Sequence, residues 1–442
     1  MDAAEAHPAP QPAAARGMGE VYAPRMSGRL APYVATDRLH ALAAGHDLPA
    51  RAHGAVLLAD ISGFTPLTEA LVKGFGPRRG GEELTRHLNL VYGALNDEIE
   101  RFGGSVIGFA GDAVTCCFDA DDGRVATRCA WRLLAIKVAV AAGAVGRFAV
   151  GDPALHVVDV LCGAVLDRVA HAEHLGARGD VVVTAEVADA CAGELAIARW
   201  LEPGQVAVVG AVHAHAPPRG WPALDVDALD VDALRAWLLP AVYRRLAGGQ
   251  GDYLAELRQA AALFLQFDGL DFERDPEVGA KLDAYVRWVQ QVVDRYEGAL
   301  IQLTTGDKGS YLYAAFGAPV AHEDAAERAV CAALALRSPP PELGFVTRTR
   351  IGLSRGQMRT GGYGSERRRT YGVLGDETNV AARLMTKAAT GQVLVSEPIV
   401  RACPGFRFEP LGELALKGKR AAVPVHALVG HADAHAQRRP RT

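Results

Sequence analysis

Two short segments of this sequence each place one acidic residue at the end of an apolar run. In residues 57–65 the apolar run ends in Asp60 and a turn rich in small residues follows, which leaves free backbone N–H groups beside a carboxylate. Asp112 follows a glycine at the expected tip of a hairpin formed by residues 105–118. Such carboxylates bind Mg²⁺, and two of them can hold two ions about 4 Å apart, a spacing suited to in-line displacement at phosphorus. The pair therefore predicts a two-metal site for a triphosphate.

The two segments, with this spacing, resemble the class III adenylyl and guanylyl cyclases. Taken singly, an aspartate that ends a strand is more often a turn or helix cap, so the prediction depends on the pair. The resemblance implies two Mg²⁺ (or Mn²⁺) ions bound by Asp60, Asp112 and the backbone carbonyl of Ile61. It also implies a phosphate cradle formed by the backbone of Gly63, Phe64 and Thr65.

Composition limits the classes of protein that fit. The chain has 442 residues, of which 50% are hydrophobic, so two domains of average size are expected. The net charge of -4 gives no broad electropositive surface, which argues against nucleic acid as the main partner, and the basic run Arg367–Arg369 is interpreted as a solvated strand face. The seven cysteines are odd in number and lack CxxC spacing, which predicts buried free thiols and a cytoplasmic location. No apolar run reaches membrane-spanning length.

The order of expected elements repeats along the chain, which indicates an internal duplication. The first half is expected to contain the strand Ala55–Asp60, a helix from Glu82 to Arg101, the hairpin Ser105–Phe118, the helix Arg124–Val140 and the strand His156–Cys162. The second half repeats this order, with the strands Arg348–Met358 and Arg369–Leu374 followed by the helix Thr378–Ala388. Gly111 aligns with Gly309 (309 − 111 = 198), so the repeats lie roughly two hundred residues apart.

This order predicts an α+β fold with two ferredoxin-like class III cyclase domains in tandem, which form a pseudo-twofold intramolecular pair. A disordered tail is expected at residues 1–30, a helical lead-in at 31–53 and a metal-binding first domain at 54–200. A linker with helices is expected at 201–257, a second domain that supplies the purine and transition-state side at 258–430, and a tail at 431–442. Because one chain supplies both sides of the site, a monomer is expected to be active.

The second half carries a glycine-punctuated strand-to-helix segment at residues 371–383. Asn379 and Arg383 are four residues apart on the expected helix, so both project from one face. An exposed polar stripe would explain such a pair in isolation. The whole segment, however, resembles the cyclase motif whose Asn orients the ribose and whose Arg stabilises the transferring phosphoryl group. Gly372 and Val373 are expected to line the purine site, where many relatives carry an Asp or Thr at the position of Gly372.

Two lysines are expected to complete this side of the site. Lys308 resembles the lysine with which soluble-type adenylyl cyclases, a tandem pair like this one, recognise the purine. Lys417 resembles a lysine of a late loop that reaches the triphosphate, although an exposed lysine beside a glycine explains it equally well. Gly108 stands where soluble adenylyl cyclase carries a lysine that helps bind bicarbonate, so activation by bicarbonate is not expected.

The two halves are not interchangeable. Where the second half has Asn379 and Arg383, the first half has Asp167 and His171. The second half has Ser310 in place of the hairpin aspartate, and its metal-turn pattern is broken at residues 266–269. One complementary site and one degenerate site are therefore expected.

The leading hypothesis is conversion of ATP to 3′,5′-cyclic AMP and pyrophosphate by two-metal catalysis at a single site between the domains. The weaker adenine contact at Gly372 leaves guanylyl cyclase activity, and hence GTP as substrate, open. A third hypothesis comes from a different class of protein, a nucleotide-binding regulatory module of a larger signalling protein that has lost turnover.

Overall fold

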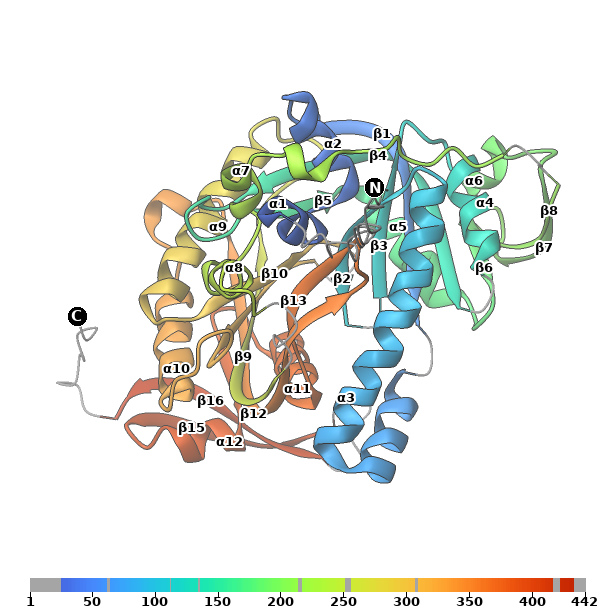
Figure 1. The fold of residues 1–442 in the computed structure, drawn as a ribbon. Coiled ribbons are helices and arrows are strands. Elements are labelled where there is room, and N and C mark those ends of the chain that lie inside the picture. The colour runs from blue at the N-terminus through green and yellow to red at the C-terminus, as the bar shows by residue number, and fades with distance from the viewer. Residues whose placement is uncertain are drawn as a thin grey trace, which may run out of the picture.

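The computed structural model describes residues 25–61, 64–111, 113–133, 136–213, 217–250, 256–306, 309–415 and 422–432. In the helical segment Phe64–Arg101, which is kinked at Gly76, the side chains of residues 64–66, 68, 69, 72, 77 and 78 are outside that description as well. The described residues form two lobes built from the same order of elements (Figure 1). The first lobe comprises residues 51–212 and the second lobe residues 256–431.

The elements of the two lobes follow one another in the same sequence. The first lobe contains β1 (Arg51–Asp60), α3 (Phe64–Arg101), β2 (Ser105–Ala110), β3 (Ala113–Asp119), α4 (Arg124–Arg132), β4 (Lys137–Val150), β5 (Val158–Cys162), α5 (Ala164–Leu175), β6 (Val181–Thr184), α6 (Ala185–Ala190), β7 (Leu195–Glu202) and β8 (Val206–Val212). The second lobe contains β9 (Glu256–Asp268), α9 (Val278–Arg295), β10 (Ala299–Thr304), β11 (Ser310–Phe316), α10 (Ala325–Leu336), β12 (Arg348–Gly364), β13 (Arg369–Leu374), α11 (Asp376–Lys387), β14 (Val393–Ser396), α12 (Glu397–Ala402), β15 (Phe406–Leu414) and β16 (Val423–His431).

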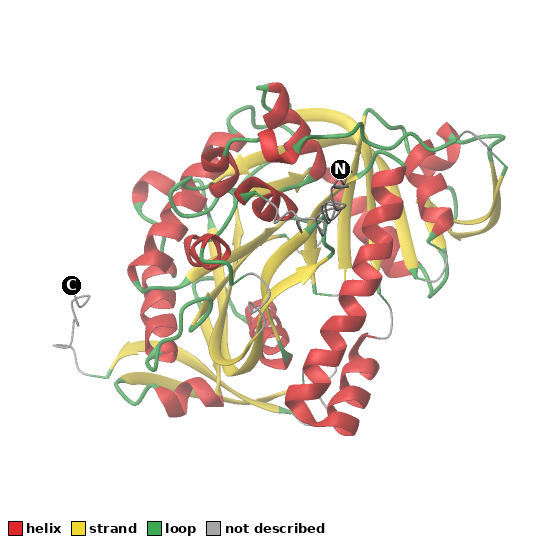
Figure 2. Cartoon of the chain, viewed as in Figure 1, coloured by secondary structure: helices red, strands yellow, loops and turns green. Residues whose placement is uncertain are grey.

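Each lobe has one mixed sheet with helices packed around its strands (Figure 2). The strand order is β2-β3-β1-β4-β6-β8-β7 in the first lobe and β10-β11-β9-β12-β14-β16-β15 in the second, with β5 paired to β4 and β13 paired to β12. The first four strands of each order, with their two helices, form the ferredoxin-like β-α-β-β-α-β unit. The structure thus confirms the predicted α+β fold of two similar domains in tandem.

Strand register shows which residues of the two lobes are equivalent. The parallel ladders begin at Val138 in β4 and at Ile351 in β12. On β1, the residue after the antiparallel partner of Val138 is Asp60. On β9, the residue after the antiparallel partner of Ile351 is Gln266. Asp60 and Gln266 therefore occupy equivalent positions in the two lobes. The residues paired with these two on β3 and β11 are 113 and 311, so residue 112 corresponds to Ser310.

Each lobe inserts a two-stranded arm into the other lobe. The first arm is the β4–β5 hairpin at residues 146–162, and the second arm is the β12–β13 hairpin at residues 359–374. Val150 and Val160 of the first arm belong to the buried core of the second lobe. Tyr363 of the second arm belongs to the buried core of the first lobe. This reciprocal packing fixes how the two lobes face each other.

The lead-in and the linker pack together on the second lobe. The lead-in contains α1 (Met26–Leu30) and α2 (Thr36–Ala44), and the linker contains α7 (Val231–Arg235) and α8 (Pro240–Ala247). Helix α1 contacts both α7 and α8 (Figure 1). Their apolar side chains share one buried cluster with residues of β9 and β11, which joins the segments outside the lobes to the sheet.

The structure corrects the expected helix Arg124–Val140. Helix α4 ends at Arg132, and from Lys137 onward the chain forms β4, which pairs with β1. The alanine-rich composition of this segment favours a helix, but its valines also suit a pleated strand that is buried on both faces. The segment forms a strand because two neighbouring strands pair with it.

Two expected boundaries also differ from the observed elements. Residues 26–30, within the stretch expected to be a disordered tail, form α1, and Leu30 is fully buried. Strand β8 lies within the range expected for the linker, because the proline and glycine at residues 203 and 204 form the turn of the β7–β8 hairpin. The remaining parts of the expected tails, residues 1–24 and 433–442, lie outside the described residues. No helix in the described ranges is both long enough and apolar enough to cross a bilayer.

Candidate functional site

Asp60 is the last residue of β1, four residues before the start of α3. Its Oδ2 atom lies 3.7 Å from the Nζ atom of Lys137, which also forms an ion pair with Glu173. The Asp60 side chain is 24% exposed, so a ligand can reach it. Ile61 follows and packs partly against the core of the first lobe. The carboxylate is thus accessible at a strand end and already has one ammonium group as a neighbour.

The β2–β3 hairpin is fixed on both sides of residue 112. Gly111 has φ +66°, a left-handed conformation that glycine adopts without strain. The buried Tyr92 hydroxyl donates a hydrogen bond to the Gly111 carbonyl at 2.6 Å. On the other side, Ala113 is the antiparallel partner of Asp60. The backbone around residue 112 therefore lies next to the end of β1.

Several residues expected at the site cannot be placed. Gly63, Asp112, Lys308 and Lys417 lie outside the described residues. For Phe64 and Thr65 only the backbone is described, and it is helical at both residues. An amino-terminal helical turn presents backbone N–H groups without intrahelical partners, the feature expected of a phosphate cradle.

The second arm places Gly372 and Val373 in buried backbone. Gly372 is paired with Gly361, and the ring of Tyr363 lies against it so closely that a Cβ at residue 372 would be 2.0 Å from Cε1 of Tyr363. Val373 is fully buried, and its carbonyl accepts a hydrogen bond from the Tyr313 hydroxyl at 2.9 Å. The backbone of Gly372 is therefore covered by the aromatic ring of Tyr363.

Helix α11 presents Asn379 and Arg383 on one face. The opposite face is buried through Val380 and Leu384, which are 1% and 0% exposed. Asn379 is exposed and Arg383 is half-buried. Within the described ranges, neither of these two side chains forms a hydrogen bond or an ion pair, so both are available to a ligand.

The start of α11 lies against the lobe that carries Asp60. Leu374, two residues before the helix, packs against the same core of the first lobe as Ile61. Arg359, the partner of Leu374 across the arm, donates a hydrogen bond to the Gly81 carbonyl of α3 at 2.7 Å. Burial lowers the pKa of Arg359 to about 10, so it remains a cation near neutral pH.

The equivalent positions of the other half carry different chemistry. Gln266 stands at the position of Asp60, and Ser310 stands at that of residue 112. On α5, at the positions of Asn379 and Arg383, are Asp167 and His171, and the His171 ring lies 3.1 Å from a carboxylate oxygen of Glu202. The register therefore establishes which positions are equivalent, and the side chains at these positions differ between the two lobes. Among the described residues, no group of three or more His, Cys, Asp or Glu side chains is placed to hold a metal ion.

Sequence reasoning missed two residues of the second arm. Arg368 is 6% exposed, so the interpretation of Arg367–Arg369 as a solvated strand face is wrong at its central residue. Tyr363 is equally buried, between Tyr92 and Phe109 of the first lobe. The available signal for Tyr363 is the glycine at residue 372, since a glycine within a strand often marks a place where another group approaches closely.

The cysteines confirm the prediction of buried free thiols for six of seven residues, with Cys331 half-buried. Burial raises the pKa of Cys117 and of Cys162 to about 12. A thiol with so high a pKa is inert at neutral pH, so these groups serve packing.

Comparison with known proteins is consistent with this geometry. Residues 278–430 match the family described as adenylate and guanylate cyclase catalytic domain. The chain is 23% identical over 433 residues to adenylate cyclase type 10 of Homo sapiens, an alignment that covers 86% of this chain and 26% of that protein. It is 32% identical over 199 residues to adenylate cyclase 1 of Rhizobium meliloti (strain 1021), which covers 41% of this chain and 29% of that protein. The chain thus spans about a quarter of the length of these curated relatives.

A solved structure shows the tandem fold. A class III adenylyl cyclase-like ATP-binding protein from Pseudomonas aeruginosa matches with a TM-score of 0.55 and 14% identity, over 80% of this chain and 85% of that chain. At this identity the likeness concerns the fold. The second lobe thus matches the cyclase catalytic-domain family, and most of the chain is similar in sequence to class III nucleotidyl cyclases.

Proposed function

We propose that this chain converts ATP to 3′,5′-cyclic AMP and pyrophosphate at one site between its lobes. The main support is the exchange of arms, because the second arm leads directly into α11 and packs on the lobe in which Asp60 ends β1. Asn379 and Arg383 project from α11 without partners among the described residues. The asymmetry between the lobes allows this combination of groups only once.

Each residue of the proposed site has one role. Asp60, the carbonyl of Ile61 and Asp112 are the oxygen donors that would hold two Mg²⁺ or Mn²⁺ ions, and such ions supply a more acidic ribose 3′-hydroxyl and charge neutralisation at the triphosphate. Asn379 orients the ribose, and Arg383 donates hydrogen bonds to the phosphoryl oxygens on which charge develops. The remaining substrate contacts are assigned to Gly63, Phe64, Thr65 and Lys417 for the phosphates and to Lys308, Gly372 and Val373 for the purine.

Incubation of the purified chain with ATP and either metal, followed by chromatography of the products, tests the proposal. Cyclic AMP should form, and Asp60→Asn should reduce its rate of formation by about a hundredfold or more without changing the urea unfolding curve. Asp268→Asn is a matched control, since Asp268 ends β9 as Asp60 ends β1 and lies 3.1 Å from Arg348. The control should retain turnover, and near-normal turnover in Asp60→Asn would contradict the assignment.

Guanylyl cyclase activity is the second candidate. The observation that favours it is the absence of a polar side chain at Gly372, where the ring of Tyr363 lies instead. Discrimination between purines then rests on Lys308 and on backbone groups. Parallel assays with ATP and GTP separate the two activities, since a higher kcat/KM for GTP would replace the first candidate by the second.

A nucleotide-binding module without turnover is the third candidate. Lys137 lies beside the Asp60 carboxylate, where it competes electrostatically with a metal ion. The similar protein from Pseudomonas aeruginosa is described as cyclase-like and ATP-binding. Tight binding of ATP without any cyclic product, in either metal, would favour this candidate.

A further inference from the structure

Strand β2, which leads into the hairpin of residue 112, lies at the edge of its sheet and contains an irregularity. Its register against β3 shifts between Val106 and Gly108. A bulge of this kind interrupts the regular alternation of carbonyl groups, and the carbonyls that it frees need other partners when they are buried.

Arg368 of the second arm supplies those partners from the other lobe. Its Nε atom donates to the Val106 carbonyl at 2.7 Å, and its Nη2 atom donates to the Ile107 carbonyl at 2.8 Å. Nη1 donates to the carbonyls of Arg369 at 2.8 Å and of Pro32 at 3.4 Å. One guanidinium thus joins the second arm, the bulge of β2 and the lead-in.

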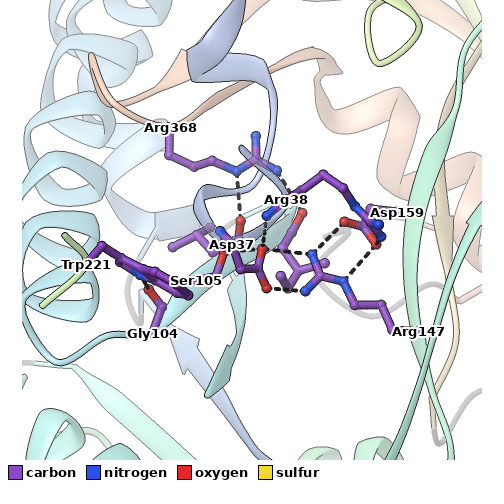
Figure 3. A network of polar contacts seen from close by, with 10 residues as sticks. Asp37, Arg38, Gly104, Ser105, Arg147, Asp159, Trp221 and Arg368 are labelled. Atoms are coloured by element: carbon purple, nitrogen blue, oxygen red, sulfur yellow. Dashed lines mark hydrogen bonds and ion pairs between the residues drawn. The ribbon is translucent and has the colours of Figure 1, made fainter. Parts of the chain in front are cut away.

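This guanidinium is a buried cation that forms no ion pair within the described residues. Burial lowers the pKa of Arg368 to about 10, while the nearby carboxylates of Asp159 and Asp37 oppose the shift, so the group stays charged at neutral pH. Figure 3 shows Arg368 beside the cluster in which Arg147 pairs with both of these aspartates. A buried charge held mainly by backbone carbonyls is costly, which indicates a specific role for its geometry.

The pseudo-equivalent residue shows a different arrangement at the degenerate side. His156 of the first arm occupies the position of Arg368 (368 − 156 = 212), and its Nδ1 atom lies 3.3 Å from the Leu300 carbonyl at the corresponding bulge of β10. Burial lowers the pKa of His156 to about 4, so its ring is neutral at pH 7. The lobe whose hairpin carries an aspartate is therefore contacted by the charged guanidinium of Arg368, and the other lobe is contacted by the neutral ring of His156.

We propose that Arg368 is a positioning residue that acts across the lobes to hold the bulged strand β2, and with it the hairpin of residue 112, in the register that metal binding needs. This proposal rests on the proposed function. Arg368 touches neither nucleotide nor metal in this account. Through Arg368, the geometry of the metal-binding hairpin in the first lobe depends on how the second arm packs against that lobe.

The test compares Arg368→Lys with His156→Gln. A lysine keeps the positive charge but lacks the planar set of guanidinium donors, so it cannot donate to both bulge carbonyls with fixed geometry. Turnover is measured against Mg²⁺ concentration, and Mn²⁺ affinity is measured by electron paramagnetic resonance in the presence of a non-cyclisable ATP analogue. Arg368→Lys should weaken apparent affinity for both metals by about tenfold with little change in the KM for nucleotide, because loss of groups that orient metal ligands typically has this size. His156→Gln should leave both affinities within about twofold of the wild type.

Urea unfolding of each variant separates positioning from general stability. Should Arg368→Lys fail to fold, Arg368→Gln removes the buried charge, keeps one amide nitrogen as a donor group and carries the same prediction. Unchanged metal affinity in the folded variant, or an equal change in His156→Gln, overturns the proposal. A wild-type chain that binds Mn²⁺ but makes no cyclic product overturns the proposed turnover alone, and the Mn²⁺ affinities still decide the role of Arg368. A wild-type chain that neither binds Mn²⁺ nor turns over overturns both.

Discussion

Replacement of Gly372 by alanine should destabilise the protein only while Tyr363 is present. A Cβ at residue 372 would lie 2.0 Å from Cε1 of Tyr363, whereas carbon atoms in contact are normally ~3.5 Å apart or more. The ring would have to shift by roughly 1.5 Å within a core where Tyr92 and Phe109 surround it, and overpacking of this kind costs about 1–3 kcal/mol.

The sign of the effect should reverse once the ring is removed. In the Tyr363→Ala background the clash is absent, and the backbone of Gly372 is not left-handed. Gly372→Ala should then stabilise the protein by about 0.4–1 kcal/mol, because alanine restricts the unfolded chain. The coupling between the two substitutions should therefore reach about 2 kcal/mol.

A double-mutant cycle measured by urea unfolding, followed by circular dichroism, checks this prediction. Gly405→Ala is the control, since a Cβ there meets no atom within 4 Å and its effect should not depend on Tyr363. The reasoning is refuted if Gly372→Ala costs the same free energy of unfolding with and without Tyr363.

Three further predictions concern groups away from the purine side. Tyr92→Phe should lower the free energy of unfolding by about 1 kcal/mol, because the hydrogen bond from the hydroxyl to the hairpin is lost. Tyr285→Phe should leave the free energy of unfolding unchanged, because the buried Tyr285 hydroxyl has no partner among the described residues. Equal losses for the two variants in urea unfolding would contradict this. Burial lowers the pKa of His156 to about 4, below its unfolded value near 6.5, so on acidification the unfolded state takes up the proton first. Lowering the pH from 7 to 5 should therefore reduce the free energy of unfolding of the wild type by about 2 kcal/mol. The His156→Gln variant should not show this loss. A wild type and His156→Gln with parallel pH profiles of unfolding would refute it. Asp37→Asn removes a carboxylate from the buried Arg147 and should cost about 3–5 kcal/mol, and a measured loss below about 1 kcal/mol would show that the cluster is not buried as described.

Much of the fold follows from local sequence signals. The apolar run that ends in Asp60 predicts a strand and its end, and the structure places β1 there. Asn379 and Arg383 lie on the helix that their spacing and the preceding glycine predict. The twofold order of elements is visible because each repeat keeps the same turns and periodicities, and the paired registers confirm it.

The misses arise where tertiary contacts outweigh local preference. Residues 137–150 form a strand because β1 and β6 pair with them, although their alanines favour a helix. Arg368 is buried by the opposite lobe and by the lead-in, and alternation within one strand cannot reveal a surface supplied by residues 261 and 262 positions away in the sequence. Tyr363 was missed for the same reason, since its packing partners belong to the first lobe.

The proposed composite site takes its carboxylates from the first lobe and its amide and guanidinium groups from the second. The most direct test is the rate of cyclic nucleotide formation in the wild type, Asp60→Asn, Arg383→Ala and Gln266→Ala, with Gln266 as the counterpart of Asp60 in the degenerate half. We expect a product in the wild type, losses of about a hundredfold or more in the first two variants, and near-normal turnover in the third. Full activity in either of the first two, or an equal loss in Gln266→Ala, would contradict it.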